Sequence, residues 1–440
     1  MKNMISKTLA SAITLATLAA CSAPMPIQQG RVPVAVGAQS ARGANFGVFN
    51  RNMTPQAVPH EVIVKVKPGM NPSLFTNNLG RAGARVKSFF DTDSRIFLVE
   101  SAARSTEDLV ATFKQDPSVE IAQPNYWFSL TQDMRPAPRM AAPNDELFPK
   151  EWHMQRVRAL EAWSQVQGQG NKDLIVAVVD TGVDYNHPDL VGNVIKGKDF
   201  TGEDPAGLDP IDSFGHGTHV AGIIAAHANN QIGVAGVAPN VKILAVKVLS
   251  AKGGGSLFAI AGGIKFSVDA GAKIVNLSLG GPAVTDLIST SIGWWATRKG
   301  ALLMAAAGNS ANEVGTPARI DDYYMAVGAT DDADKLAKFS CFGKELSVTS
   351  PGTVIWATTP TYHVPLNDYG YAMNYAPLQG TSMATPLAAG VAALVWSKHP
   401  EWTAKQVRAQ MEKTSVDLGA PGKDNTFGHG RIDALAALSN

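Results

Sequence analysis

The 440-residue sequence has little cysteine and almost no net charge. Cysteine occurs only at Cys21 and Cys341, which excludes a disulfide framework and favours a small buried hydrophobic role for Cys341. Its 38 basic and 37 acidic residues give a formal net charge of +1, so nucleic acid and anionic membrane surfaces are not expected as main partners. A hydrophobic content of 45% is ordinary for globular domains, and the length allows two or three of them.

The apolar stretch at residues 9–20 is too short to remain as a membrane-spanning helix. With Lys2 and Lys7 before it, it has the charged and hydrophobic parts of a secretion signal. It ends in Leu18-Ala-Ala-Cys21, which resembles a bacterial lipoprotein signal, where the cysteine is acylated and becomes the new N-terminus. We expect an extracytoplasmic protein, anchored at the cell envelope through Cys21 or secreted. The alternative is a cysteine that falls by chance near an ordinary cleavage point.

Composition and periodicity divide the chain into a signal peptide (1–20), a flexible Pro-, Gln- and Gly-bearing tether (21–59), a small α+β unit (60–130), a Pro- and Met-rich processing linker (131–142) and a large domain (143–440). The small unit is predicted to contain strands, at 62–67, 96–100 and 119–122, and helices, near 72–82 and at 106–115.

The large domain alternates apolar strand-like runs with helical ones. Strands are predicted at 174–179, 242–248, 273–277 and 301–306, and helices from His216, from Ser256 and over 286–298. This alternation indicates right-handed βαβ crossovers, so the predicted fold class is α/β, a mostly parallel sheet with helices on both faces.

Three motifs each place one reactive side chain: Val178-Val-Asp-Thr-Gly-Val-Asp184, Gly215-His-Gly-Thr-His-Val-Ala-Gly222 and Gly380-Thr-Ser-Met-Ala-Thr-Pro386. They supply Asp180 at the carboxyl end of a buried strand and His216 and Ser382 at the starts of two helices. A serine hydroxyl needs an imidazole to take its proton, and that imidazole needs a carboxylate to fix its tautomer. Asp180, His216 and Ser382 fill these roles.

These motifs, in this order, resemble the subtilases, the subtilisin-like serine proteases of peptidase family S8, and within them the thermitase-like members. The resemblance covers residues 143–438 and implies a serine endopeptidase acting on proteins or peptides through an acyl-enzyme. Ala305-Ala-Ala-Gly-Asn-Ser310 matches the segment whose asparagine, here Asn309, binds the oxyanion. The resemblance further implies that residues 60–130 are a ferredoxin-like pro-domain, which acts as folding chaperone and intramolecular inhibitor. It also implies a self-processing zymogen with a monomeric catalytic domain.

The resemblance also implies a cleft that holds an extended peptide between two glycine-rich segments, since a partner backbone must approach closely there. The implied substrate-binding residues are Gly253, Gly254, Gly255, Ser278, Leu279, Gly280, Gly281 and Gly315. Gly315, near the floor of the specificity pocket with Pro317 after it, implies a preference for a large apolar side chain before the cleaved bond.

A structural calcium ion is the implied cofactor. The corresponding ligands are Asp145, Asp189, Asn230, Ile232 and Val234, which offer the hard oxygen atoms that calcium prefers. Surface Asx turns are the alternative for each Asp and Asn alone.

Other interpretations remain open at this stage. His216-Gly-Thr-His219 could suggest a zinc pair, but the metalloprotease motif needs a glutamate after its first histidine, so His219 is predicted to be a buried core histidine. An inactive protease-derived scaffold would normally have lost one of the reactive residues. Transpeptidation also passes through an acyl-enzyme, but the sequence marks no dedicated amine acceptor site.

Overall fold

The computed structural model describes residues 56–69, 75, 79–89, 95–130, 147–166 and 170–439, all within one compact unit, residues 45–440. The expected signal peptide, Cys21, most of the tether, the linker 131–142 and Asp145 lie outside the described residues. Within the described part of the chain, no helix combines the length and apolarity needed to cross a membrane.

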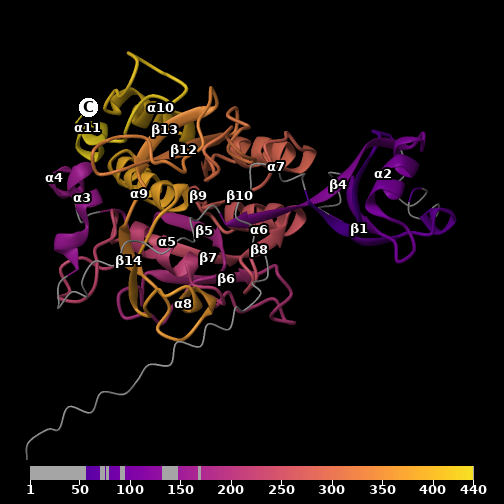
Figure 1. Cartoon of the computed structure of the whole chain (residues 1–440), viewed down its shortest axis with the longest axis horizontal. Coiled ribbons are helices and arrows are strands. Elements are labelled where there is room, and N and C mark those ends of the chain that lie inside the picture. The colour runs from indigo at the N-terminus through magenta and orange to yellow at the C-terminus, as the bar shows by residue number, and fades with distance from the viewer. Residues whose placement is uncertain are drawn as a thin grey trace, which may run out of the picture. The chain divides into compact units, whose positions relative to one another are not determined.

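The larger part of the molecule is built on a seven-stranded sheet in which every neighbouring pair is parallel. Its order is β13-β12-β11-β9-β5-β7-β6 (Figure 1). The strands are β5 (Ile175–Asp180), β6 (Val194–Asp199), β7 (Lys242–Lys247), β9 (Ile274–Leu277), β11 (Leu302–Ala306), β12 (Tyr324–Thr330) and β13 (Leu346–Pro351). The α/β prediction is confirmed.

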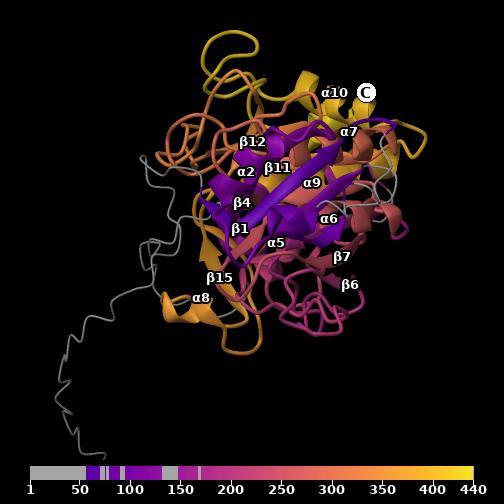
Figure 2. The same cartoon turned by 90° about the vertical axis from the view of Figure 1, so that its right-hand side faces the viewer.

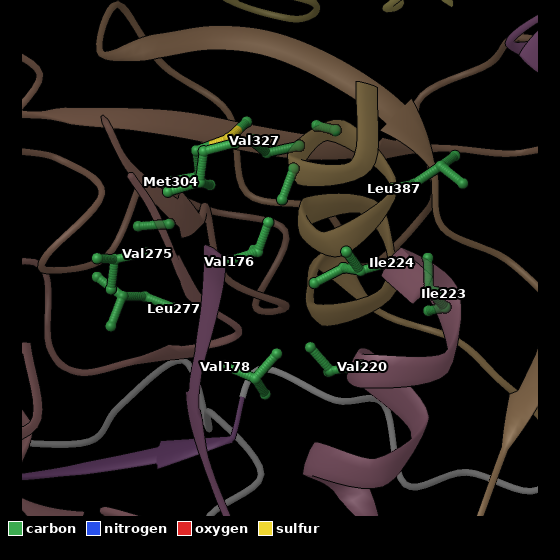
Figure 3. Close-up of a cluster of buried hydrophobic side chains, with 14 of the residues drawn as sticks. Val176, Val178, Val220, Ile223, Ile224, Val275, Leu277, Met304, Val327 and Leu387 are labelled. Carbon is green, nitrogen blue, oxygen red and sulfur yellow. The ribbon is translucent and has the colours of Figure 1, made fainter. Parts of the chain in front are cut away.

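Helices cover both faces of this sheet, because most of its strands are apolar on both sides. The main helices are α5 (His216–Ala225), α6 (Leu257–Asp269), α7 (Leu287–Arg298), α9 (Thr381–Lys398) and α10 (Ala404–Thr414). Shorter ones are η2 (Phe148–Lys150), α3 (Trp152–Arg156), α4 (Ala159–Trp163), α8 (Pro365–Asp368) and α11 (Ala434–Leu438). Figure 3 shows Val176 and Val178 of β5 directed toward Val220 and Ile224 of α5, with Leu387 of α9 in the same cluster.

Two helices begin where the sequence predicted, because polar caps fix their first turns. The Ser256 hydroxyl accepts a hydrogen bond from the Ala259 amide at the start of α6. The Asp286 carboxylate does the same for the Ser289 amide at the start of α7. Such caps satisfy backbone N–H groups that have no partner within the helix.

The N-terminal unit is an antiparallel sheet of order β4-β1-β3-β2 (Figure 2). Its elements are β1 (Ala57–Val66), η1 (Leu79–Ala82), β2 (Arg85–Phe89), β3 (Ile96–Glu100), α2 (Thr106–Lys114) and β4 (Val119–Leu130). Val62, Val64 and Val66 pack in a cluster with Leu109 and Phe113 of α2. Ile63, Ile96 and Leu98 belong instead to the core cluster of the large sheet, so both faces of the small sheet are covered.

Strand β4 is longer than predicted and belongs to two sheets. The sequence predicted a strand at 119–122, whereas β4 continues to Leu130. Its last residues pair with β8 (Gly254–Ser256) on one side and β10 (Leu279–Gly280) on the other. The extension forms because these two segments offer their edges to residues 127–130.

Candidate active site

The site is organised around the carboxyl end of β5. β7 and then β6 lie on one side of β5, and β9, β11, β12 and β13 lie on the other. The chain therefore changes direction across the sheet at β5, and in open α/β sheets such a switch point leaves a crevice beyond the strand ends. Asp180 is the last residue of β5 and its side chain is fully buried.

Asp180 and His216 form a buried pair. The Asp180 Oδ1 lies 2.8 Å from His216 Nδ1 and also accepts a hydrogen bond of 2.7 Å from the Thr181 amide. A carboxylate acceptor assigns the proton to Nδ1, which leaves a lone pair on Nε2. Among the described residues, His216 Nε2 and Asp180 Oδ2 have no hydrogen-bond partner. The imidazole is thus oriented as a proton acceptor.

Gly217 allows the first turn of α5 to lie against β5. A Cβ atom at this position would lie 2.0 Å from the Gly182 carbonyl oxygen and 3.2 Å from the Asp180 Cβ. No side chain larger than hydrogen fits without moving one of the two segments. The close approach brings the His216 ring within reach of the Asp180 carboxylate.

Asp212 was not singled out from the sequence, yet it links both segments that carry the pair. Its Oδ1 accepts hydrogen bonds from the Thr181 hydroxyl and from the amides of Phe214 and Gly215. Its Oδ2 accepts two more, from the Thr218 amide and hydroxyl. Burial raises the pKa of the Asp212 carboxyl, and these donors oppose that effect. An aspartate four residues before a helix-opening histidine was the available signal.

Ser382 is the second residue of α9, which packs against α5. Its hydroxyl donates to the Ser278 carbonyl at 3.0 Å, and the Ser278 hydroxyl donates to the Ser382 carbonyl at 2.8 Å. The Ser382 amide belongs to the first turn of a helix, where backbone N–H groups and the positive end of the helix dipole favour a developing negative charge.

Asn309 follows β11 and is oriented by the residue before Ser382. Its Oδ1 accepts hydrogen bonds of 3.0 Å from both the amide and the hydroxyl of Thr381. Because the amide oxygen is held in this way, the donor group Nδ2 is fixed on the opposite side of the side chain. The link between Asn309 and Thr381 ties the asparagine to the start of α9.

The predicted cleft residues border the end of β4. Phe128 and Ser129 lie opposite Gly255 and Gly254 of β8, and Ser129 and Leu130 lie opposite Gly280 and Leu279 of β10. The glycines are needed here, since a Cβ on Gly254 would lie 2.4 Å from the Trp127 indole and one on Gly281 would lie 3.0 Å from the Phe128 ring. Gly315 adjoins the same segment, since a Cβ on it would lie 2.8 Å from the Gly281 carbonyl oxygen.

The Peptidase S8 (Subtilase family) profile matches residues 171–430. The chain belongs to the subtilase family. It is 36% identical over 383 residues to the thermophilic serine proteinase of Bacillus sp. (strain AK1), covering 87% of this chain and 88% of that protein. It is 40% identical over 300 residues to thermitase of Thermoactinomyces vulgaris, covering 67% of this chain and 99% of thermitase. These relatives identify the chain as a serine protease of the subtilisin type.

A solved structure supports the same subtilase fold. Fervidolysin from Fervidobacterium pennivorans, described as a keratinolytic enzyme related to subtilisin, superposes with a TM-score of 0.74 at 26% identity. The match covers 87% of this subtilase but only 61% of the fervidolysin chain. The fold is therefore shared across most of the present chain.

The predicted calcium ligands are partly brought together in this subtilase. Asp189 is fully buried; its Oδ1 accepts from Asn230 Nδ2 at 2.7 Å and its Oδ2 from the Val234 amide at 3.0 Å. Ile232 is nearby in the chain, and its amide donates to Asn230 Oδ1. Burial raises the pKa of the Asp189 carboxyl, and hydrogen bonds from the Val234 amide and from Asn230 oppose that effect. No group of three or more His, Cys, Asp or Glu side chains is close enough to hold a metal ion in the described residues.

The remaining candidate residues have structural positions. His219 is fully buried, with Nε2 3.0 Å from the Ala376 carbonyl oxygen, and burial lowers its pKa to about 3. The prediction of a core histidine is confirmed. Cys341 is buried behind the segment that carries Asn309, with its sulfur 3.1 Å from the Ser310 hydroxyl.

Proposed function

We propose that this subtilase is an active serine endopeptidase that hydrolyses peptide bonds through an acyl-enzyme and is made as a self-processing zymogen. The observation that carries the proposal is the buried Asp180–His216 pair, 2.8 Å apart, whose Nε2 has no hydrogen-bond partner among the described residues. A buried polar atom without a hydrogen-bond partner destabilises the fold, so its presence calls for an explanation, and a catalytic role is one. Ser382, at the start of the neighbouring helix, is the proposed proton donor.

In the proposed reaction, His216 Nε2 takes the proton of the Ser382 hydroxyl as Oγ attacks the substrate carbonyl. Asp180 stabilises the resulting imidazolium. Ser382 Oγ must exchange the Ser278 carbonyl for the imidazole, a change that often accompanies substrate binding. The Ser382 amide and Asn309 Nδ2 are the proposed donors to the oxyanion, each contributing about 3 to 4 kcal/mol of transition-state stabilisation.

The N-terminal unit is the proposed intramolecular inhibitor. Strand β4 lies between β8 and β10, which are the segments expected to bind an extended substrate. Phe128 is 2% exposed and packs over Gly281, so the cleft already holds a large apolar side chain from the same polypeptide. An enzyme in this state cannot bind another peptide along that edge.

The pairing register also indicates which bond is cut during maturation. Gly280 lies opposite Ser129 and Leu279 opposite Leu130, and the next residue back along that segment is Ser278, whose carbonyl accepts the Ser382 hydroxyl. The residue after Leu130 is Thr131. We therefore infer cleavage of the Thr131–Gln132 bond, with Gln132 as the new N-terminus.

Intact-mass analysis of purified wild type beside Ser382→Ala tests these proposals. Wild type should yield fragments that meet at Thr131–Gln132, and the variant should remain unprocessed. A fluorophosphonate probe should label Ser382 in the processed wild type; absence of labelling would favour an inactive scaffold. Ligated products formed from added amine nucleophiles would favour transpeptidation over hydrolysis.

Substrate preference is proposed from Gly315, which adjoins Gly281 at the edge of the cleft. A pocket with glycine at this position has room for a large apolar or aromatic side chain before the cleaved bond. The smaller Thr131 also fits such a pocket, and cleavage within one polypeptide does not depend on the preference of the enzyme for free substrates. Peptide libraries should show that preference, and a strong preference for Arg or Asp would contradict it.

Calcium is the proposed structural cofactor. Asp189 and Asn230, with loop carbonyls of Ile232 and Val234 and with Asp145, supply oxygen atoms of the type that calcium prefers. Burial disfavours the charged form of Asp189, and a bound cation would offset that cost, which fits this assignment. Chelation should lower the melting temperature, and an unchanged midpoint would remove the proposal.

Export through a lipid anchor at Cys21 is proposed from the sequence alone. Metabolic labelling with palmitate should mark the wild type and not Cys21→Ser. Labelling that persists in the variant, or absence of label in both, would contradict the anchor.

A further inference from the structure

The hairpin of β14 (Ile355–Thr358) and β15 (Tyr375–Leu378) is interrupted by a long excursion, residues 359–374, that contains α8. The hairpin itself packs against α5: the Thr358 hydroxyl donates to the Thr218 carbonyl, and His219 bonds to the Ala376 carbonyl. The excursion then continues past the helix to the loop that precedes His216.

Three contacts join the excursion to residues 212–215. The Tyr362 hydroxyl donates to the Asp212 carbonyl oxygen at 2.8 Å. The Leu366 amide donates to the Phe214 carbonyl at 3.1 Å. The Leu366 side chain, which is fully buried, lies against Gly215, where a Cβ would be 2.9 Å from it. Gly215 is the residue immediately before His216 and has a φ of 113°, a conformation that favours glycine. The packing of Leu366 therefore helps to fix the backbone next to His216.

A fourth contact fixes the beginning of the excursion. The amide and hydroxyl of Thr361 both donate to Asp184 Oδ2, at 2.9 and 2.8 Å. The Asp184 amide in turn donates to the Thr218 hydroxyl oxygen, at 2.9 Å, in the first turn of α5. Residues on both sides of His216 are therefore tied to the excursion.

The same stretch of chain leads directly to the nucleophile. β15 ends at Leu378, and only three residues separate it from Ser382. One continuous segment thus contacts the loop that carries the proposed base and continues into the helix that carries the proposed nucleophile. A shift of the excursion would change the distance between His216 and Ser382.

We propose that Tyr362 and Leu366 are positioning residues, which set the placement of His216 relative to Ser382 through residues 212–215. This inference rests on the proposed protease activity. The Tyr362 hydroxyl bonds to Asp212 and the Leu366 side chain packs on Gly215, so the effect is exerted through these two residues. Loss of either contact should lower kcat, because small displacements of catalytic groups reduce the population of reactive geometries.

The test compares Tyr362→Phe, which removes one hydroxyl, and Leu366→Ala, which removes the packing on Gly215. Leu366→Met is the conservative variant that retains the volume. The matched control is His363→Ala, because His363 lies between the two in the chain, is exposed, and pairs with the equally exposed Asp368. For each processed enzyme, kcat and KM for a peptide substrate are measured per site titrated with a fluorophosphonate, beside the melting temperature.

We expect kcat per titrated site to fall about threefold in Tyr362→Phe and about tenfold or more in Leu366→Ala, with KM within twofold of wild type. Leu366→Met and His363→Ala should match wild type. If Leu366→Ala fails to fold, Tyr362→Phe still decides the question. A lower melting temperature with unchanged kcat per titrated site would show a purely structural role and overturn the inference. Absence of labelling and turnover in wild type would instead overturn the proposed function.

Discussion

The N-terminal unit and the large sheet each bury a carboxylate beside a basic side chain. The two sites differ in whether all the polar atoms have hydrogen-bond partners. Glu61 is 6% exposed; its Oε1 accepts from Lys87 and its Oε2 from Asn125. Hydrogen bonding to Glu61 raises the pKa of Lys87, so the lysine stays charged. In the Asp180–His216 pair, one carboxylate oxygen and one ring nitrogen have no partner among the described residues. The Glu61 site holds strands together, whereas the Asp180–His216 pair leaves a lone pair on Nε2 that can accept a proton.

The most severe test of this difference is Asp180→Asn. The amide retains the size of the carboxylate but presents a donor or a weaker acceptor to Nδ1, so the imidazole loses its fixed tautomer. We expect kcat to fall by roughly 10⁴-fold with little change in melting temperature. A fall in kcat of less than about tenfold would show that His216 Nε2 is not the reacting base. Steady-state kinetics on the titrated enzyme gives the answer.

Asn309→Ala should have the next largest effect. Its side-chain amide is oriented by two hydrogen bonds from Thr381, and its Nδ2 is the proposed donor to the oxyanion. We expect kcat to fall by about 10²- to 10³-fold, with KM nearly unchanged. If KM rose while kcat stayed constant, Asn309 would bind the ground state instead.

Acid should destabilise the large sheet through two other buried histidines. Burial lowers the pKa of His153 and of His219 to about 3. Between about pH 6.5 and pH 3 the unfolded chain therefore binds more protons than the folded one, and stability falls as pH falls, by about 1.4 kcal/mol per pH unit for each histidine. Urea unfolding of the Ser382→Ala protein, which cannot digest itself, should show a loss of about 3 kcal/mol by pH 5.5 for the pair.

The control for this pH dependence is His363→Ala, an exposed histidine that should leave the slope unchanged. His219→Gln should reduce the slope by about half. A slope that is the same in wild type and His219→Gln would contradict the assignment to buried histidines.

The smallest effect is expected from Glu61→Gln in the N-terminal unit. The amide leaves either Lys87 or Asn125 without its acceptor in a buried site, at a cost of about 1 to 3 kcal/mol. Hydrogen exchange of the β1 amides in the Ser382→Ala background should report this loss, while kcat of the processed enzyme stays unchanged. Glu120→Gln, which removes an exposed ion pair with Lys65, should cost less than about 0.5 kcal/mol.

Most of the large sheet could be predicted because its strands are uninterrupted apolar runs. The predicted strands at 174–179 and 242–248 agree with β5 and β7 within one residue at each end. β6 was missed, since its sequence VIKGKD has two exposed lysines and a glycine. Gly197 is required there because a Cβ would lie 2.2 Å from the Ala245 carbonyl oxygen, a constraint set by the neighbouring strand.

The residues proposed to react could be singled out from the sequence, because Asp180, His216 and Ser382 stand in recognisable local motifs. The residues that hold them could not. Tyr362 donates a hydrogen bond to Asp212, which lies 150 residues earlier in the chain. Local sequence patterns do not encode such a pairing. The extension of β4 to Leu130 was missed for the same reason, because its partner strands lie more than a hundred residues further along the chain.

Strand β4 contributes its first part to the N-terminal sheet and its last residues to the cleft, with both halves hydrogen-bonded along their edges. In the proposed zymogen, departure of the N-terminal unit after cleavage would require these cleft bonds to open together with the contacts of Ile63, Ile96 and Leu98. Onset of activity would then be governed by a dissociation rate, and the length of one strand would set the delay between synthesis and action.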